Sequence, residues 1–417
     1  MTEATGMAPK PDERMRRTRV IRTQVAIIGA GPAGLTLAGL LANAGIESVV
    51  LERQTREHVE SRVRAGVLEQ ATVEVLRQAG AGERMHHEGL IHHGIRIQFA
   101  GERHRLPLSE LTGGETIVVY GQTEVVKDLI TARLSAGLPL RFGVDDVAIE
   151  HIDTERPAVR FSDENERFEL ACEAIAGCDG FHGVSRLAMT PPLRIYAREY
   201  PIAWLGILAA VAPSCDELVY AHHERGFALL SLRSPQLSRL YIQCAADERL
   251  EDWSDARIWE ELQRRVALDG WSLNEGPVIE KGITGMRSFV AAPMQRGRLF
   301  LAGDSAHIVP PTGAKGLNLA VADVAVLAES LIELFSSDSD RALAAYSQRC
   351  LQRVWRAEQF SYWMTSMLHR LSDDPFDEQM QLSQLRYLVS SEPAARSLAE
   401  NYVGLPIGRS AATRVSR

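Results

Sequence analysis

Three glycines near the start of the chain have the spacing of a nucleotide-binding loop. Gly29, Gly31 and Gly34 lie in the string VAIIGAGPAGL, directly after an apolar segment typical of a buried strand. The first glycine permits a tight turn, the second lets a pyrophosphate approach backbone N–H groups, and the third allows close helix–strand packing. Pro32 and Ala33 begin that helix, whose positive end would face the phosphates. The pattern predicts a dinucleotide site.

A carboxylate at the end of the next apolar segment supports this prediction. Glu52 follows the apolar run Val49–Leu51. It lies about 20 residues beyond the loop, where a carboxylate can accept hydrogen bonds from ribose hydroxyls. In the simpler alternative the glycines serve only a tight turn, and the strand–loop–helix–strand context argues against it. The loop does not distinguish FAD from a nicotinamide nucleotide.

Two later segments carry polar side chains at alternate positions. The string GFALLSLRS places Ser231 and Arg233 on one face of a strand, and LSRLYIQ places Arg239 and Tyr241 on one face of the next. A hydroxyl, two guanidinium groups and a phenol are together suited to bind a carboxylate. A solvated outer face of a sheet fits the same alternation equally well.

A short hairpin would bring these two strands together. If the pairing is centred on Gln236, Ser231 opposes Tyr241. The same register places Arg233 opposite Arg239. Two facing arginines repel each other unless an anion lies near them. An aromatic carboxylate held bidentately by Arg233 is therefore a natural ligand.

The hydrophobic periodicity predicts the elements that position these residues. A strand, a helix closed by Gly45 and a second strand surround the glycine loop, as in a Rossmann-like unit. Period-two alternation follows in the middle of the chain, and helical patterns dominate its last part. The predicted strands include 23–29, 48–51, 148–161 and 169–176, the latter two resembling antiparallel strands. The predicted helices are 33–44, 68–79, 123–136, 253–268, 317–335, 340–368 and 378–389, with coil at 401–406.

The expected fold class is therefore α/β, with a Rossmann-like nucleotide-binding domain, a β-sheet substrate domain and a C-terminal helical region. The expected boundaries are 1–20 for a disordered extension, 21–194 for the nucleotide-binding domain, 195–305 for the β-rich substrate domain, 306–406 for the helical region, and 407–417 for a tail.

Charge and cysteine content restrict the partners and the compartment. The chain has 417 residues, with 46 Lys and Arg against 54 Asp and Glu, and this net charge of -8 argues against nucleic acid. Five cysteines without a CxxC pair favour a reducing, cytoplasmic location. The basic stretch 14–22 and the apolar run 25–44 resemble a secretory signal, but glycines and a proline interrupt the run. We expect no membrane segment.

Two further segments indicate that the nucleotide is FAD. AIAGCDGFHGVSR carries Asp179 after a strand, and RLFLAGDSAHIVPPTGAKGLNLA carries Asp304 after another. They resemble the DG and GD motifs of the FAD-dependent aromatic hydroxylases, class A, in which two aspartates approach the ribose and pyrophosphate. The helix that begins near Gly316 would point its free N–H groups, around Leu317 and Asn318, at an anionic reduced flavin. An ordinary helix cap is the alternative.

The resemblance covers about residues 22–406 and includes the substrate strands. Family members that act on 4-hydroxybenzoate bind its carboxylate with a Ser-x-Arg strand and a following Arg-x-Tyr strand, and this sequence has both. The resemblance assigns catalysis to Tyr220, Tyr402 and Pro311. It assigns the substrate to Ser231, Arg233, Tyr241, Tyr220, Pro311 and Thr312. It assigns FAD to Gly29, Gly31, Pro32, Ala33, Gly34, Glu52, Arg53, Arg62, Arg64, Gln122, Asp179, Arg239, Asp304, Gly316, Leu317 and Asn318.

The reaction that the resemblance implies is hydroxylation of 4-hydroxybenzoate at carbon 3, giving protocatechuate, with NADPH and O2 through a flavin hydroperoxide. It also implies a homodimer and a role in aromatic compound catabolism. A phenolate is more electron-rich at its ortho carbon than a phenol, so the enzyme must remove the phenol proton. A tyrosine with a pKa near 10 needs a hydrogen-bonded partner for this, and Tyr220 with Tyr402 fits. Another hydroxy- or aminobenzoate remains an alternative substrate.

The nicotinamide cofactor is assigned by the same resemblance. Its expected contacts are Arg53, Gln54, Arg62, Arg64, Phe181, His182 and Arg287. Arginine at position 53 suits a 2'-phosphate. His58 departs from the family, because NADPH-specific relatives tend to carry tyrosine there. We expect NADPH to be preferred, with NADH as a possible second donor.

Two other classes of function fit the sequence less well. The string HHEGLIHHG could suggest a metal site, but neighbouring histidines on a strand point to opposite faces and no cysteine or carboxylate completes the set. We expect no metal. A flavin-binding protein without hydroxylase activity would lack the set Ser231, Arg233, Tyr241, Tyr220 and Tyr402, which is complete here.

Overall fold

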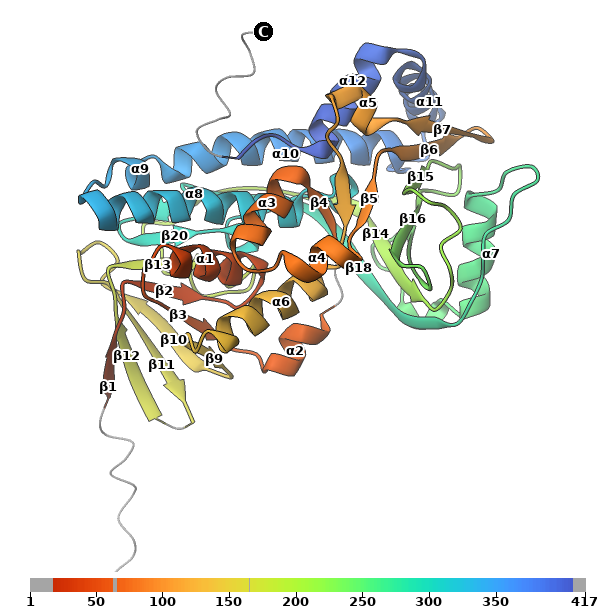
Figure 1. Ribbon diagram of the computed structural model, residues 1–417. Helices are drawn as coiled ribbons and strands as arrows, with labels where there is room; N and C mark the ends of the chain where they lie inside the picture. The colour runs from red at the N-terminus through yellow and green to blue at the C-terminus, as the bar shows by residue number, and fades with distance from the viewer. Residues whose placement is uncertain (1–17, 63–65, 165, 408–417) are drawn as a thin grey trace, which may run out of the picture.

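The computed structural model describes residues 18–62, 66–164 and 166–407. Figure 1 shows an α/β half and a sheet half, with two long helices, α8 (Gly316–Ser337) and α10 (Tyr346–Leu368), lying side by side above them. In the described part of the chain, no helix combines the length and the apolar character needed to cross a membrane. The α/β class expected from the sequence is confirmed.

The α/β half is built on a six-stranded sheet in the order β19-β20-β13-β2-β3-β9. The strands β20, β13, β2, β3 and β9 are parallel, and β19 is antiparallel to β20. Residues of β2 and β3 are almost wholly buried, because α1 packs on this sheet and apolar side chains from the segment 158–171 join the same core. The bounds are β2 Val25–Ile28, α1 Pro32–Asn43, β3 Ser48–Glu52, α6 Gln122–Ser135, β9 Leu140–Phe142, β13 Ala174–Gly177, β19 Gln295–Arg296 and β20 Leu299–Leu301.

The sheet half contains eight strands in the order β21-β18-β14-β17-β16-β15-β6-β7. One face packs Leu205, Leu230 and Ile242 against helix α7, in a single apolar cluster. The other face turns Tyr220, Phe227 and further side chains toward the C-terminal helices. The bounds are β6 Ile95–Phe99, β7 Glu102–Leu106, β14 Arg194–Ala209, β15 Val219–Ala221, β16 Ala228–Ser234, β17 Leu237–Ala245, α7 Asp255–Arg265, β18 Val278–Ala292 and β21 His307–Ile308.

Two small sheets and several helices complete the fold. One sheet has the order β1-β12-β11-β10 and the other β4-β8-β5. Their bounds are β1 Arg19–Arg22, β10 Asp145–Glu150, β11 Ala158–Asp163, β12 Glu166–Ala171, β4 Val67–Glu69, β5 Leu90–His92 and β8 Ile117–Val119. The remaining helices are α2 Arg56–Ser61, α3 Gln70–Gln78, α4 Glu83–Glu88, α5 Leu108–Thr112, α9 Arg341–Ala344, α11 Pro375–Ser390 and α12 Glu392–Val403; short 3-10 turns lie at Leu250–Asp252, Gly303–Ser305 (η3) and Pro311–Gly313 (η4).

Several sequence expectations need correction. The coil expected at 401–406 is wrong in its first half, because Tyr402 lies in the last turn of α12. The segment 169–176 is two strands, and the second, β13, is parallel to β2 in the six-stranded sheet. His86 and His87 lie on α4, not on a strand. Arg19 and Val20, expected in the disordered extension, belong to β1; residues 1–17 and 408–417 lie outside the described part.

The two large sheets each draw strands from separate parts of the chain. β6 and β7 come before residue 194 in sequence but belong to the eight-stranded sheet, where β6 pairs with β15 and β7 pairs with β6. β20 lies in sequence between β18 and β21 of the eight-stranded sheet but pairs with β13 of the six-stranded sheet. The chain therefore passes between the halves several times, which brings distant segments to one junction.

Candidate active site

The glycine loop has the geometry that its spacing predicts. Gly29 has a positive φ of 104°, and a Cβ added there would lie 2.3 Å from the Cys178 backbone oxygen. At Gly34, an added Cβ would lie 2.0 Å from the Gly29 oxygen. At Gly31 it would meet no atom of the described residues within 4 Å, so this glycine borders open space at the start of α1. That space is where a pyrophosphate would approach the helix N–H groups.

Glu52 fastens this loop to the end of β3. One carboxylate oxygen accepts the Ala30 N–H at 2.8 Å, and the other accepts the Gln54 N–H at 2.8 Å. A carboxylate has about four acceptor positions, so bonds to ribose hydroxyls can be added without breaking these two. Arg53, the residue between, is exposed.

The two aspartate motifs lie at the ends of neighbouring parallel strands. Asp179 follows β13, and Asp304 lies in η3, just after β20. One oxygen of Asp179 accepts the Ser185 N–H at 2.9 Å, while the other is buried without a partner in the described residues. Burial raises the pKa of Asp179, so its free oxygen is a site where a hydroxyl donor would be stabilised. Asp304 is exposed.

Helix α8 begins at Gly316 without a side-chain cap on its first N–H groups. A Cβ on Gly316 would meet no protein atom within 4 Å, so this end of the helix is open. Asn318 is already engaged: its amide accepts the Glu69 N–H at 2.9 Å and donates to the Val67 oxygen at 3.0 Å. Its side chain therefore fixes β4 against α8, and only its backbone N–H remains for a ligand.

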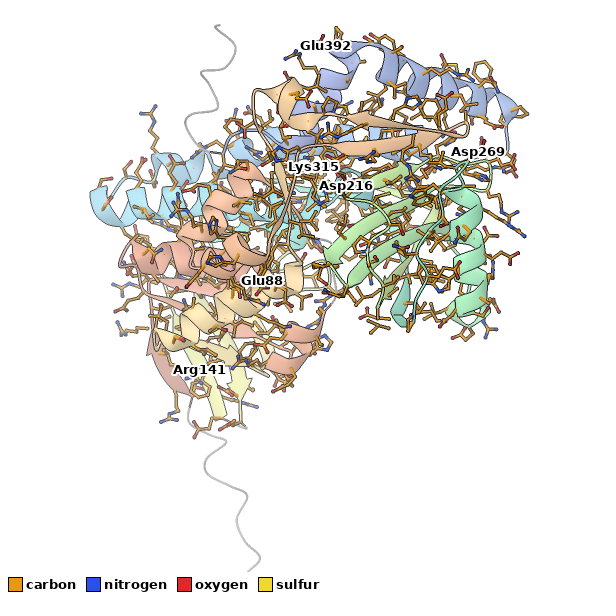
Figure 2. The ribbon with its side chains drawn as sticks, turned by 45° about the vertical axis from the view of Figure 1, so that its right-hand side comes forward. Glu88, Arg141, Asp216, Asp269, Lys315 and Glu392 are labelled. Carbon is orange, nitrogen blue, oxygen red and sulfur yellow. The ribbon has the colours of Figure 1, made fainter. Side chains whose placement is uncertain are left out.

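Lys315 is a buried cation that the sequence reasoning missed. Its Nζ donates to Glu69 Oε1 at 2.6 Å and to the Tyr402 backbone oxygen at 2.9 Å, and burial lowers its pKa. Figure 2 shows Lys315 near the centre of the molecule, where the two halves meet. The signal was available: a lysine just before a helix N-terminus opposes the helix dipole and requires a compensating partner.

The residues expected to contact the nicotinamide nucleotide fall in two groups. Phe181 packs edge-on against His182 with centroids 5.0 Å apart, and the Arg287 guanidinium lies 5.0 Å from the Phe181 centroid. Arg53 and Gln54 follow β3 on a separate segment. Arg62 ends α2, where its backbone oxygen accepts the Thr123 hydroxyl at 2.7 Å. Gln122 begins α6, and Arg64 lies outside the described residues.

One face of the eight-stranded sheet carries the expected substrate residues. The cross-strand register aligns Tyr220 with Leu229, Leu229 with Tyr241, and Tyr241 with Gly206 in one row. Ser231 lies in the next row, opposite Arg239. Since paired residues in a sheet share a face, all of these side chains point the same way.

The hairpin register expected from the sequence is wrong by two residues. Ser231 opposes Arg239 instead of Tyr241, because the turn is a tight Pro235–Gln236 link and the register shifts at Arg233. A slip of one residue would have moved every side chain to the opposite face, but a slip of two keeps the faces. Ser231, Arg239 and Tyr241 therefore share a face as expected.

The two arginines lie together without a carboxylate. Arg233 donates to the Leu232 oxygen at 2.8 Å and lies 3.4 Å from Ser231 Oγ, and burial lowers its pKa. Arg239 is buried, and its Nη1 has no hydrogen-bond partner among the described residues. Within that same part of the chain neither arginine forms an ion pair. An unpaired buried guanidinium is costly, so this corner fits an anionic ligand.

Two tyrosines from distant parts of the chain meet beside this row. The Tyr220 and Tyr402 hydroxyls are 2.5 Å apart and hydrogen-bonded, and both side chains are fully buried. Burial raises the pKa of both phenols. The two phenols are coupled through this hydrogen bond, so a proton can pass between their oxygens.

Pro311 and Thr312 form η4, the turn that precedes α8. Thr312 is fully buried, and its hydroxyl lies 2.9 Å from the Thr365 hydroxyl of α10. Pro311 is exposed. This turn therefore lies between the open end of α8 and the long helix that crosses both halves.

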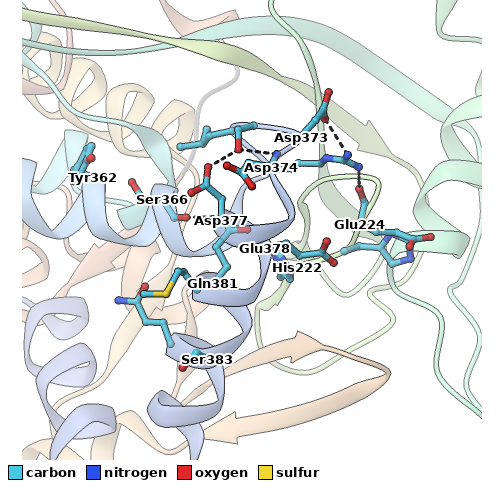
Figure 3. A pocket seen from close by; sticks show the side chains of 16 residues that line it. His222, Glu224, Tyr362, Ser366, Asp373, Asp374, Asp377, Glu378, Gln381 and Ser383 are labelled. Carbon is cyan, nitrogen blue, oxygen red and sulfur yellow. Dashed lines mark hydrogen bonds and ion pairs between the residues drawn. The ribbon is translucent and has the colours of Figure 1, made fainter.

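A separate cavity of about 590 Å³ lies at the start of α11. Figure 3 shows Asp373, Asp374, Asp377, Glu378 and Glu224 among the residues that line it. A carboxylate ligand would be repelled by these acidic side chains. The cavity is therefore a poor match for an aromatic acid, and the sheet face with the two arginines is the better candidate.

Comparisons with known proteins show which family and which fold this chain is similar to. The family model described as "FAD binding domain" matches residues 22–361. The p-hydroxybenzoate hydroxylase of Acinetobacter baylyi is 49% identical over 391 residues, which cover 93% of this chain and 96% of that protein. Rifampicin monooxygenase of Rhodococcus hoagii is 27% identical over 72% of this chain and 62% of its own length. The crystal structure of p-nitrophenol 4-monooxygenase from Pseudomonas putida shares the fold, with a TM-score of 0.80, 20% identity, and coverage of 93% and 99%.

Proposed function

We propose that this chain, which belongs to the FAD-dependent aromatic hydroxylases and within them to the p-hydroxybenzoate hydroxylase family, hydroxylates 4-hydroxybenzoate. The product would be protocatechuate, with the new hydroxyl at carbon 3 and with NADPH and O2 as co-substrates. The observation that carries the substrate is the pair of neighbouring arginines, Arg239 buried and Arg233 partly buried, neither of which forms an ion pair with a carboxylate in the described residues. A cytoplasmic homodimer that acts in aromatic compound breakdown completes the proposal.

The residues present fit FAD. Open space at Gly31 and Gly316 would admit its pyrophosphate and its flavin beside two helix N-termini, and the free oxygen of Asp179 would accept a hydroxyl. Bound FAD would supply the electron transfer and the activated oxygen that no side chain can supply. The positive end of α8 would stabilise negative charge on the reduced ring, while Lys315 just before it is held by Glu69 and the Tyr402 backbone oxygen.

At the carboxylate end, the side chains of the sheet would orient the substrate. Arg233 offers a bidentate guanidinium, and the hydroxyls of Ser231 and Tyr241 add neutral donors. Because Arg239 has a buried Nη1 without a partner, it adds positive potential to the same corner. A neutral ring without the carboxylate would leave these charges uncompensated.

At the phenol end, the tyrosine pair would take the proton. The Tyr220 hydroxyl would accept the proton of the substrate phenol as it passes its own to Tyr402, 2.5 Å away, and Tyr402 would in turn release its own proton toward solvent. This makes the ring carbon beside the phenol oxygen electron-rich, which is where the new oxygen is expected. Because both tyrosine side chains are buried, bulk water is kept away from the phenol end of the site.

The nicotinamide nucleotide that donates the electrons is assigned from separate groups of residues. Phe181, His182 and Arg287 form one contact group that could hold part of a nicotinamide nucleotide. Arg53 is exposed at the end of β3, where it could bind a 2'-phosphate. His58 is exposed on α2 in the same segment. We propose NADPH as the preferred donor, and a strong preference for NADH in turnover efficiency would refute this.

Arg233→Ala tests the substrate assignment. Wild-type protein should form one protocatechuate per NADPH consumed, and the variant should bind 4-hydroxybenzoate about 100-fold more weakly because a charge-assisted bidentate contact is lost. The neutral amide 4-hydroxybenzamide should lose little affinity on the same substitution. Arg264→Ala, on the exposed side of α7, is the matched control. NADPH consumption that yields only peroxide in the wild type would overturn the assigned substrate.

A further inference from the structure

A chain of buried contacts joins the carboxylate end of the site to the turn before α8. It runs through the end of α10, residues 365–369, and through Trp204 on β14. Trp204 Nε1 donates to His369 Nε2 at 2.7 Å, and His369 Nδ1 lies 3.1 Å from the Thr365 oxygen. The Thr365 hydroxyl in turn lies 2.9 Å from the Thr312 hydroxyl.

The partners of His369 fix its protonation state. An indole N–H can only donate, so Nε2 must accept; a backbone oxygen can only accept, so Nδ1 must donate. His369 is therefore the neutral tautomer with its hydrogen on Nδ1. It is fully buried, and burial lowers its pKa to about 3, in agreement with this assignment.

At the other end, Trp204 is part of an aromatic cluster behind the substrate residues. Its ring lies 4.8 Å from the Tyr241 ring and 5.4 Å from the Phe227 ring, centroid to centroid. Phe227 packs against His369 at 4.3 Å and against Tyr220 at 6.1 Å. The cluster therefore contacts both Tyr241, at the carboxylate end, and Tyr220, at the phenol end.

We propose that Trp204 and His369 are positioning residues, which set where the aromatic acid lies between Tyr241 and the Pro311–Gly313 turn. The inference rests on the proposed function, because it takes Tyr241 as a carboxylate ligand. One helix end, through Thr365 and His369, holds both the turn beside the open end of α8 and the wall behind Tyr241. A small displacement of the aromatic acid is enough for NADPH to be consumed and oxygen activated without hydroxylation of the ring.

Trp204→Phe and His369→Asn both remove the hydrogen bond between the two rings. Each should weaken 4-hydroxybenzoate binding about ten-fold and divert a larger share of NADPH consumption to hydrogen peroxide, with the FAD content unchanged. His369→Gln places an amide oxygen near the position of Nε2. It should therefore restore much of the hydroxylated product per NADPH consumed that His369→Asn loses. A role in packing alone would not distinguish these two amides.

Trp259→Phe is the matched control, since Trp259 is a buried indole on α7 at the opposite face of the sheet. This variant should bind 4-hydroxybenzoate with wild-type affinity and form the same share of hydrogen peroxide per NADPH consumed. Thr365→Val, which keeps the side-chain shape but removes the hydroxyl beside Thr312, should also raise the peroxide share and serves if Trp204→Phe does not fold. The inference would be overturned if Thr365→Val and His369→Asn gave the wild-type share of hydrogen peroxide per NADPH consumed. It would also be overturned if Trp259→Phe raised that share, or weakened substrate binding, as much as Trp204→Phe does. A wild type that makes no protocatechuate would instead overturn the proposed function.

Discussion

At Gly29 and Gly34 the glycine loop leaves no room for one added carbon, whereas across the eight-stranded sheet the site depends on side chains from distant segments. A Cβ on Gly29 or Gly34 would overlap a backbone oxygen. On the sheet, the Tyr220 hydroxyl meets the hydroxyl of Tyr402, which is 182 positions away in sequence. The first region recognises its ligand with backbone N–H groups and a helix end, and the second with guanidinium and phenol groups.

This difference decides how each region tolerates change. Backbone recognition depends on φ angles and on close approach, so a single methyl group can abolish it. Side-chain recognition depends on which face and row of the sheet a residue occupies. A substitution there can remove a binding or catalytic group while the fold is kept. The two regions should therefore respond differently to small changes.

Gly29→Ala and Gly31→Ala make the sharpest test, because both add one methyl group to the same loop. At Gly29 the methyl would lie 2.3 Å from the Cys178 oxygen at a positive φ, so we expect a loss of roughly 3 kcal/mol or more in unfolding free energy and no stable FAD binding. At Gly31 the methyl meets no protein atom, so the apo-protein should unfold at the wild-type temperature while FAD binds about ten-fold more weakly.

Thermal unfolding of the apo-proteins and fluorescence titration with FAD measure the two effects separately. Equal loss of stability in both variants would contradict the assignment of Gly31 to ligand approach. Equal FAD affinity in Gly31→Ala and the wild type would contradict it as well.

Tyr402→Phe tests the side-chain region with a change of one oxygen atom. Because the hydroxyl pair is 2.5 Å apart and buried, its loss should slow product formation about 100-fold in a single turnover of reduced enzyme mixed with oxygen. Binding of 4-hydroxybenzoate and of FAD should stay within about two-fold, because Tyr402 is not assigned a contact with the carboxylate. An unchanged rate of product formation would remove Tyr402 from the proton path.

The sequence predicted the glycine loop well because its determinants are local. Gly29, Gly31 and Gly34 lie within one turn and one helix start, and the positive φ at Gly29 follows from the motif itself. Helix α8 was also expected to begin near Gly316, where its open end is found. Short-range sterics are sufficient for such features.

The sheet site was predicted only in part because register depends on long-range contacts. Alternation placed Ser231, Arg239 and Tyr241 on one face, and this is confirmed. The pairing was wrong by two residues, since the turn geometry at Pro235–Gln236 is not determined by alternation. Lys315 was missed because its partners Glu69 and Tyr402 become neighbours only in the folded chain.

Gly206→Ala examines a position where the two kinds of recognition meet. Gly206 lies opposite Tyr241, and a Cβ there would lie 2.8 Å from Arg239 Nη2 and 3.4 Å from the Tyr241 ring. The backbone needs no positive φ at this position, and the end of an arginine can move, so the unfolding temperature should change little. The displaced guanidinium should weaken 4-hydroxybenzoate binding by about five-fold, with FAD binding unchanged. Gly282→Ala is the control, because Gly282 pairs with Gly206 across the sheet and its Cβ would meet no atom within 4 Å. If both variants bind the substrate equally well, Arg239 contributes nothing to the carboxylate corner, and backbone shape would matter only in the nucleotide region.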